Sequence, residues 1–277
     1  MPITMCSSTP SSRSVLSRWL AAAALAAASL SSQAGPVGLS QDTHAYAYRS
    51  GPAAVVKQPG VVASHDVRID GADWLRLQFE GVQLPRNAQL RITSLQDGAQ
   101  QHLNAKTLAQ WQNTSAYFNG SAVRVELLAT RAGQAGQFGI SKVLAGKPQE
   151  LPESQCGTTD DRVASNVADR ARLLDVGCTA NLMVKGCFIT AGHCLASASL
   201  VDVVEFNVPA SNANGSLNHP APKDQYVPTA NRQFSNGGIG KDWGVFTVAP
   251  NTETGLTPLQ AQGAGLKMSK TVPAVGD

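Results

Sequence analysis

The residues best suited to chemistry lie in the segment CFITAGHC, residues 187–194, where a histidine follows an apolar run. The run from Cys187 to Thr190 predicts a buried β-strand, and the small residues Ala191 and Gly192 allow a tight turn after it. We therefore expect His193 to project from the end of the strand instead of into the core. An imidazole held there can act as a general base, because its ordinary pKa lies near neutrality.

The segment GCTANLMVKGCFITAGHC, residues 177–194, resembles the first strand pair of the trypsin/chymotrypsin-like serine peptidases, which carry a C…TA(A/G)HC motif. The resemblance implies that His193 is the catalytic histidine and that Cys178 and Cys194 form the disulfide beside it. The family orders its triad His, Asp, Ser. Asp242 follows His193 by 49 residues and opens the apolar stretch DWGVFTV, so the resemblance implies that it is the family's aspartate.

A shielded carboxylate at this position can accept the imidazole N–H, select the tautomer and stabilise the imidazolium that forms during catalysis. We expect Trp243 and the buried strand that follows it to supply this shielding.

The similarity to serine peptidases covers about residues 157 to 250. At its start, GTTDDRV resembles a segment near the mature start of secreted bacterial glutamyl-endopeptidase-like enzymes. Chains of this bacterial type carry an N-terminal accessory or pro-domain. The resemblance therefore implies a β-domain followed by the first barrel of a chymotrypsin-like double barrel.

The nucleophile of such a triad is not found in its expected context. Beyond Asp242 the only serine is Ser269, 27 residues on and without the Gly-Asp-Ser-Gly sequence around it. In the family the serine, the oxyanion hole and the specificity pocket belong to the second barrel. We expect a C-terminally truncated chain, with the second barrel mostly missing, that is inactive by itself.

The remaining sequence predicts an all-β protein. Alternating apolar and polar residues mark four strands before residue 147, and Asp97-Gly98 and Asn119-Gly120 are turn signals. We interpret residues 61–146 as a jelly-roll-like β-sandwich, and NAKTLAQWQN as a short helical turn or irregular connection. The four strand segments are WLRLQF, QLRITSL, AVRVELLA and QFGISKVL.

The domain boundaries follow from changes in composition. We expect a signal peptide at 1–34, a leader or linker at 35–60, the β-sandwich accessory or pro-domain at 61–146 and a connector at 147–177. Residues 178–277 then form the first barrel and the start of the second. The signal peptide is indicated by two arginines before a 12-residue apolar run and small residues at the cleavage site, so we expect a secreted protein, extracellular or periplasmic.

Four cysteines remain after removal of the signal peptide with Cys6. In a secreted chain they suggest two disulfides, with three possible pairings. The bridge implied by the resemblance, Cys178–Cys194, leaves Cys156 and Cys187 either as a second pair or as thiols. A zinc site of Cys178, Cys187, His193 and Cys194 is disfavoured, because the spacing C-x8-C-x5-H-C matches no usual pattern. We expect no metal and no cofactor.

The composition limits the partners. The net charge is +3 and there is no Lys/Arg run, so we expect no nucleic-acid partner, and no membrane association once the signal is cleaved. A protein or peptide substrate is expected, with a glycan or an intramolecular partner for the β-sandwich. We also expect Trp74 and Trp111 in the core, and His44, His65, His102 and His219 on the surface.

Two functions follow from these features. The first is a serine endopeptidase that forms an acyl-enzyme, with His193 as base, Asp242 as orienting residue and a serine beyond residue 277. The alternative is a non-catalytic secreted binding protein with a decayed peptidase domain. A Gly-Asp-Ser-Gly sequence further along the gene would distinguish the two.

Overall fold

The computed structural model describes residues 38–52, 55–148, 165–196 and 202–271. All of them belong to one compact unit, Pro36–Asp277. The predicted all-β class is confirmed, with 46% strand and 9% helix. The predicted signal peptide, Cys156 and the GTTDDRV segment lie outside the described residues. No helix in the described part is long and apolar enough to span a bilayer.

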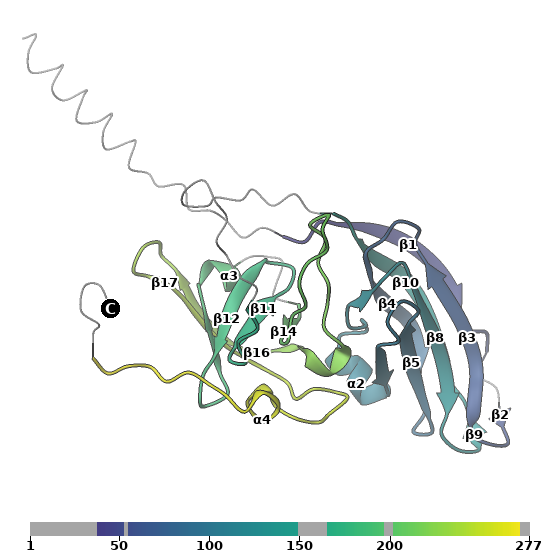
Figure 1. Cartoon of the computed structure of the whole chain (residues 1–277). Coiled ribbons are helices and arrows are strands. Elements are labelled where there is room, and N and C mark those ends of the chain that lie inside the picture. Colours follow the sequence, from purple (N-terminus) through teal and green to yellow (C-terminus); the bar gives the residue numbers. More distant parts are fainter. Residues whose placement is uncertain (1–37, 53–54, 149–164, 197–201, 272–277) are drawn as a thin grey trace, which may run out of the picture. The chain divides into compact units, whose positions relative to one another are not determined.

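The N-terminal sheets, as we call residues 41–146, are two four-stranded antiparallel sheets that lie face to face (Figure 1). One sheet has the strand order β1-β10-β4-β7 and the other β3-β8-β5-β6, with a small pair of β2 and β9 beside them. The strands are β1 (Gln41–Arg49), β2 (Val55–Val56), β3 (Gly60–Arg68), β4 (Trp74–Gln83), β5 (Ala88–Ser94), β6 (Gln100–Leu103), β7 (Phe118–Asn119), β8 (Ala122–Ala129), β9 (Gly133–Gln134) and β10 (Gln137–Gly146).

The alternation seen in the sequence determines which face of each strand is buried. In β5 every second residue is buried, from Ala88 to Ser94. Both sheets contribute to one hydrophobic core, which includes Leu77, Leu90, Val125 and Ile140. Burying each such side chain contributes about 1.5–3 kcal/mol. The predicted core positions of Trp74 and Trp111 are confirmed.

The expectation of a leader or linker at residues 35–60 is wrong for its central part. β1 occupies Gln41–Arg49 and pairs with β10 along most of its length. Tyr46 and Tyr48 alternate with exposed residues and pack against the core. β1 is an edge strand with one half-buried face, so its apolar signal is weak in the sequence. The predicted helical turn is confirmed as α2 (Ala105–Gln110), which Asn104 caps.

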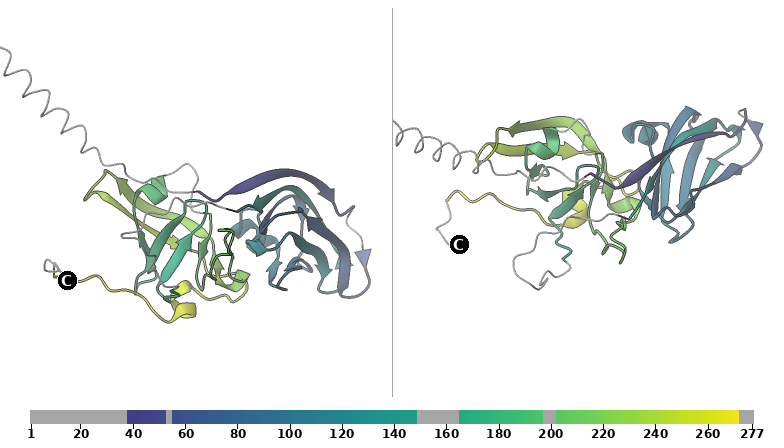
Figure 2. Two further views of the ribbon diagram at one scale, coloured as in Figure 1. Left: turned by 45° about the horizontal axis from the view of Figure 1, so that its top comes forward. Right: turned by 90° about the horizontal axis from the view of Figure 1, so that it is seen from above.

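The barrel, as we call residues 170–271, is a nearly closed seven-stranded sheet (Figure 2). Its strand order is β15-β14-β11-β12-β13-β17-β16. The two outer strands of this order are joined by Val227 alone, and its carbonyl accepts the N–H of Ala249, which brings the sheet close to closure. The elements are β11 (Arg170–Leu173), β12 (Cys178–Leu182), β13 (Phe188–Thr190), α3 (His193–Ala196), β14 (Val204–Glu205), η1 (Pro222–Asp224), β15 (Gln225–Tyr226), β16 (Pro228–Asn236), β17 (Asp242–Val248) and α4 (Pro258–Gln262).

The barrel begins earlier than expected. Residues 147–177 were expected to form a connector, but β11 lies within them and pairs with both β12 and β14. Ala171 and Leu173 point into the barrel core, while arginines occupy the alternate positions. A strand of only four residues, two of them arginines, gives too weak an apolar pattern to be predicted from the sequence alone.

Candidate active site

The turn after β13 places His193 at the start of α3. β13 lies between β12 and β17, with Thr190 opposite Gly244. Gly192 then passes so close to the β16–β17 hairpin that a Cβ atom there would lie 1.9 Å from the carbonyl oxygen of Ser235. Only glycine permits this approach, which brings the backbone of His193 against the first residue of β17.

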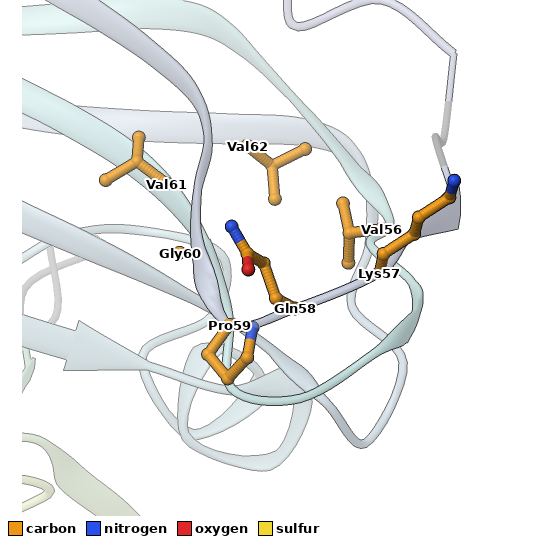
Figure 3. Close-up of a pocket in the computed structure, with 7 residues that line it drawn as sticks. All are labelled: Val56, Lys57, Gln58, Pro59, Gly60, Val61 and Val62. Carbon is orange, nitrogen blue, oxygen red and sulfur yellow. The ribbon is translucent and has the colours of Figure 1, made fainter.

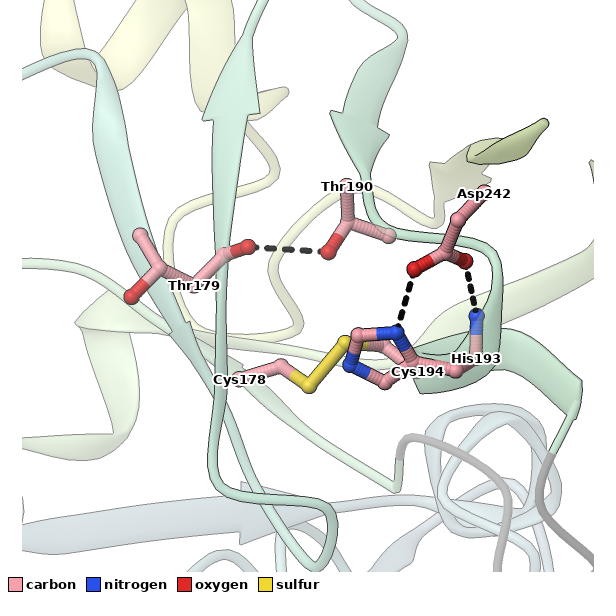
Figure 4. Close-up of a disulfide and its surroundings, with 6 residues drawn as sticks. All are labelled: Cys178, Thr179, Thr190, His193, Cys194 and Asp242. Atoms are coloured by element: carbon pink, nitrogen blue, oxygen red, sulfur yellow. Dashed lines mark hydrogen bonds and ion pairs between the residues drawn. A yellow bond between two sulfur atoms is a disulfide. The ribbon is translucent and has the colours of Figure 1, made fainter. Parts of the chain in front are cut away.

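Asp242 is that first residue, and it contacts His193 at two points (Figure 4). Its Oδ1 atom accepts the backbone N–H of His193 at 2.8 Å. Its Oδ2 atom lies 2.6 Å from the Nδ1 atom of the imidazole. The structure therefore brings together the two residues that the sequence suggested as a catalytic pair.

The geometry defines the protonation of the imidazole. An ionised carboxylate can only accept hydrogen bonds, so the Nδ1 atom of His193 carries the proton. In the neutral ring the Nε2 atom is then free to accept a proton. The pKa of Asp242 is lowered, first by the hydrogen bond from the His193 ring and then by the backbone N–H of His193. Asp242 therefore remains ionised and keeps the imidazole in this tautomer.

The disulfide Cys178–Cys194 is present, as the resemblance implied. It connects the first residue of β12 to the residue after His193, and Cys194 is buried. On the other side of the turn, the hydroxyl of Thr190 at the end of β13 donates to the carbonyl oxygen of Thr179 on β12 at 2.9 Å. The turn that carries His193 is therefore attached to β12 on both sides. The threonine contact was not predicted from the sequence, although Thr190 belongs to the quoted motif.

Cys187, one of the two cysteines of the second predicted bridge, is half-buried and has a free thiol in the structure. Its proposed partner, Cys156, lies outside the described residues. The pairing of these two cysteines remains a prediction.

A metal site at this position conflicts with the bonding of its sulfur atoms. Cys178, His193 and Cys194 have potential ligand atoms within 4.8 Å of one another. However, both sulfur atoms are joined in the disulfide, so neither is a thiolate, the form of cysteine that binds metals.

The expected shielding by Trp243 is wrong, because this side chain is 47% exposed. Trp243 lies opposite Ser235 on the outer face of the β16–β17 hairpin, whereas Asp242 and Gly244 face α3. The side chains of His193 and Asp242 are 31% and 21% exposed. The side chains of the pair are therefore partly accessible to solvent. A Cβ on Gly244 would lie 2.6 Å from Leu195, so the small residue allows α3 to pack on β17.

No serine in the described part of the chain is hydrogen-bonded to the Nε2 atom of His193. Ser269 lies beyond α4, is exposed, and bonds with Thr271. The prediction that Ser269 is not the nucleophile agrees with this placement.

Two of the hollows on the surface of the described residues bear on the location of the site. One is at the turn before β3 and is lined by a single stretch, residues 56–62 (Figure 3). Lys57 is its only charged residue, so no catalytic groups converge there. The other, of about 320 Å³, is adjacent to Leu195 of α3 and contains Asp202 and Arg232.

The sequence analysis missed a buried group of ionisable side chains in the barrel. His219 is 2% exposed, so the expectation of a surface position is wrong. Its Nδ1 atom lies 2.8 Å from Glu205, which also receives hydrogen bonds from Arg172. Burial opposes ionisation of Glu205, but His219 and Arg172 outweigh it and lower the pKa of this carboxyl. The loop sequence NHPAP contains no signal of burial, because the covering residues come from the N-terminal sheets.

Comparison with family models, with curated proteins and with solved structures finds no match to this chain.

Proposed function

We propose that this chain carries the base and the orienting acid of a serine-type endopeptidase. The observation that supports this function best is the double contact of Asp242 with the ring and the backbone of His193. A carboxylate that holds both groups restricts the imidazole to one tautomer and one orientation, as a general base requires. The nearby disulfide adds rigidity to the same turn.

The proposal also includes the arrangement of the domains. The N-terminal sheets would be a jelly-roll-like β-sandwich, and the barrel would be the first of a chymotrypsin-like pair. The second barrel, which follows residue 277 in this proposal, would supply the serine, the oxyanion hole and the specificity pocket. His193 and Asp242 are both partly exposed, which leaves room for such a neighbour.

In the proposed reaction, the Nε2 atom of His193 takes the proton from the serine hydroxyl as its oxygen attacks the peptide carbonyl carbon. The C–N bond then breaks, the amine leaves with the proton from Nε2, and an acyl-enzyme remains. Water attacks the ester by the same route, which releases the acid and restores the serine. Asp242 remains ionised throughout and stabilises the imidazolium.

The proposed location is outside the cell or in the periplasm. The Cys178–Cys194 disulfide supports it, because such bonds persist mainly in oxidising compartments. The substrate would be a protein or peptide, and the chemistry needs no cofactor.

The test is peptide hydrolysis by the protein encoded by the complete gene. We expect Asp242→Asn to lower kcat about ten-thousand-fold, because the imidazole would adopt the wrong tautomer. His193→Ala should lower kcat to a similar extent with little effect on folding. Ser269→Ala is the matched control and should leave hydrolysis unchanged.

Retained turnover in the His193→Ala variant would refute the proposal. The absence of a Gly-Asp-Ser-Gly sequence after residue 277, together with no hydrolysis, would favour the alternative of a non-catalytic binding protein.

A further inference from the structure

We infer that the N-terminal sheets are a permanent intramolecular partner of the barrel, so that the two pieces remain bound when the chain between them is cut. This inference goes beyond the proposed peptidase function and does not depend on it. It predicts that the N-terminal sheets are not lost as a dissociating pro-domain. Four groups of contacts support it.

The first contact is made by the side-chain amide of Gln225 on β15. Its Oε1 atom accepts the backbone N–H of Tyr117 at 2.9 Å, and its Nε2 atom donates to the Tyr117 carbonyl at 2.8 Å. Gln225 is completely buried. The amide therefore satisfies both backbone groups of Tyr117, as a neighbouring β-strand would.

The second contact is the reciprocal of the first. Asn119 on β7 uses its Oδ1 atom to accept the backbone N–H of His219 at 2.8 Å. Its Nδ2 atom donates to the carbonyl of His219 at 2.9 Å. Each part of the molecule thus contributes one side-chain amide that pairs with the backbone of the other part, an arrangement that we call the amide clasp.

The third contact neutralises a buried charge. Arg76 on β4 is 4% exposed, and its Nη1 atom lies 2.6 Å from the Oδ2 atom of Asp202. Arg76 also lies over the ring of Tyr117, which stacks on His219. A guanidinium buried without its carboxylate is strongly unfavourable, so separation of the two parts must be coupled to solvation of Arg76.

The fourth group of contacts involves the loop after β17. Glu253 accepts the backbone N–H of His102 at 2.7 Å and lies 3.0 Å from its ring Nδ1 atom. The indole N–H of Trp111 donates to Thr252 at 3.1 Å. The contacts therefore reach β6 and α2 as well as β4 and β7.

These contacts distinguish a permanent partner from a removable one. A part that dissociates needs a surface whose polar groups are solvated when it is free. Here buried amide, backbone and guanidinium groups on each side find their partners on the other side. Separation would leave these groups to be solvated at once, along with the aromatic surfaces of Trp74 and Tyr117.

The test cuts the folded, full-length chain. A recognition site for a specific protease is inserted after Pro152, so that Cys156 and the other cysteines of the processed chain all stay with the barrel piece and no disulfide can hold the pieces together. The protein is immobilised through a C-terminal tag, cleaved and washed, and the retained N-terminal piece is measured over time. We expect it to remain bound.

Variants identify the contacts that hold the pieces. Gln225→Ala should speed the loss of the N-terminal piece about tenfold or more, because two buried backbone groups lose their partners. Glu253→Ala, in a loop, should speed the loss by about threefold. The control is Gln78→Ala, whose amide bonds to the Asn113 carbonyl within the N-terminal sheets and should change nothing.

Immediate loss of the N-terminal piece from the unsubstituted protein would overturn the inference. Retention in both the Gln225→Ala and Glu253→Ala variants as long as in the unsubstituted protein would overturn the assignment of these contacts as what holds the pieces together. If Gln225→Ala does not fold, the Glu253→Ala variant decides the question by itself.

Discussion

At the residue scale, the proposed function depends on the separate contacts that the two oxygen atoms of one carboxylate make. Asp242 gives one oxygen to the backbone N–H of His193 and the other to the ring. The backbone contact fixes the position of the His193 main chain, and the ring contact fixes the orientation of the imidazole. A single hydrogen bond to the ring would leave the position of the histidine to the short helix α3 alone.

The ionisation of Asp242 provides a prediction. Its pKa is lowered, chiefly by the hydrogen bond from the His193 ring, so the carboxylate stays ionised as the pH falls through the ordinary range of aspartate, about 4. Its contribution to stability is thus fully present above that range and is lost only as the pH falls through its own lower pKa. We expect His193→Ala to raise the pKa of Asp242, as measured by carboxyl-carbon NMR titration.

Asp66 serves as the reference in the same spectra. Its pKa is lowered by its cross-strand neighbour Arg124 in the N-terminal sheets, so it should not respond to the change at His193 in the barrel. An unaltered titration of Asp242 in the variant would show that the hydrogen bond to His193 is not the cause.

Gly192 provides the second prediction. A methyl group at this position would meet the carbonyl oxygens of Ser235 and Trp243, which are backbone atoms and cannot rotate away. We expect Gly192→Ala to lower the free energy of unfolding by about 3 kcal/mol and to weaken the contact between His193 and Asp242. Urea denaturation measures the first effect.

The comparison for Gly192→Ala is Gly98→Ala. Gly98 has a φ of +75° and no neighbour near its missing Cβ, so its substitution costs only backbone strain, about 1 kcal/mol. Equal losses in the two variants would argue against the close approach.

At the scale of elements, the strand–turn–helix unit of β13 and α3 is held by its neighbours more than by its own hydrogen bonds. α3 has only four residues, too few for an isolated helix to persist in water. β12 holds it through the disulfide, and β17 holds it through Asp242 and the packing of Leu195 on Gly244. The site therefore depends on three elements that are separated along the chain.

Removal of the disulfide tests this dependence. Cys178 and Cys194 are 16 residues apart, and closing a loop of this length stabilises a protein by about 3 kcal/mol. We expect the Cys178→Ser/Cys194→Ser double variant to lose about that much stability in urea denaturation. Cys187 has a free thiol in the structure, so Cys187→Ser is the control. A loss of stability in this control as large as that of the double variant would contradict the assignment of the effect to the Cys178–Cys194 bridge.

At the scale of the whole molecule, the two parts meet through buried polar groups that neither could leave unpaired. His219, Glu205 and Arg172 form one group from the barrel, and Asn119 covers it from the N-terminal sheets. The stability of the molecule should therefore depend on the protonation of this group.

Burial lowers the pKa of His219, although Glu205 opposes the shift, and Arg172 and Arg76 add to it. The unfolded chain then binds more protons than the folded chain below about pH 6.5, the ordinary histidine value. The contribution of neutral His219 to the free energy of unfolding is fully present above that pH and is lost as the pH falls below it. We expect the free energy of unfolding to decrease between pH 7 and pH 5, and His219→Gln to reduce this slope. A slope that persists in full would exclude His219 as its origin.

The sequence alone was sufficient for the features that depend on local order. Alternation of apolar and polar residues predicted the all-β class and strands such as β5, β8 and β17. The AGHC segment and Asp242 identified the candidate pair, and the family resemblance implied the Cys178–Cys194 bridge. These signals are readable because each depends on residues that are adjacent in the chain or on a short motif.

Only the tertiary structure decided the features that depend on distant partners. β1 and β11 are strands because of the strands that pair with them, and their own patterns are too short or too polar to show it. Trp243 is exposed although its neighbours are not, because it lies on the outer face of its hairpin. His219 is buried because Tyr117 and Asn119 cover it, and the clasp residues Tyr117 and Gln225 are 108 positions apart. Burial of a polar group is determined by which remote segment packs on it, and the local sequence does not contain that information.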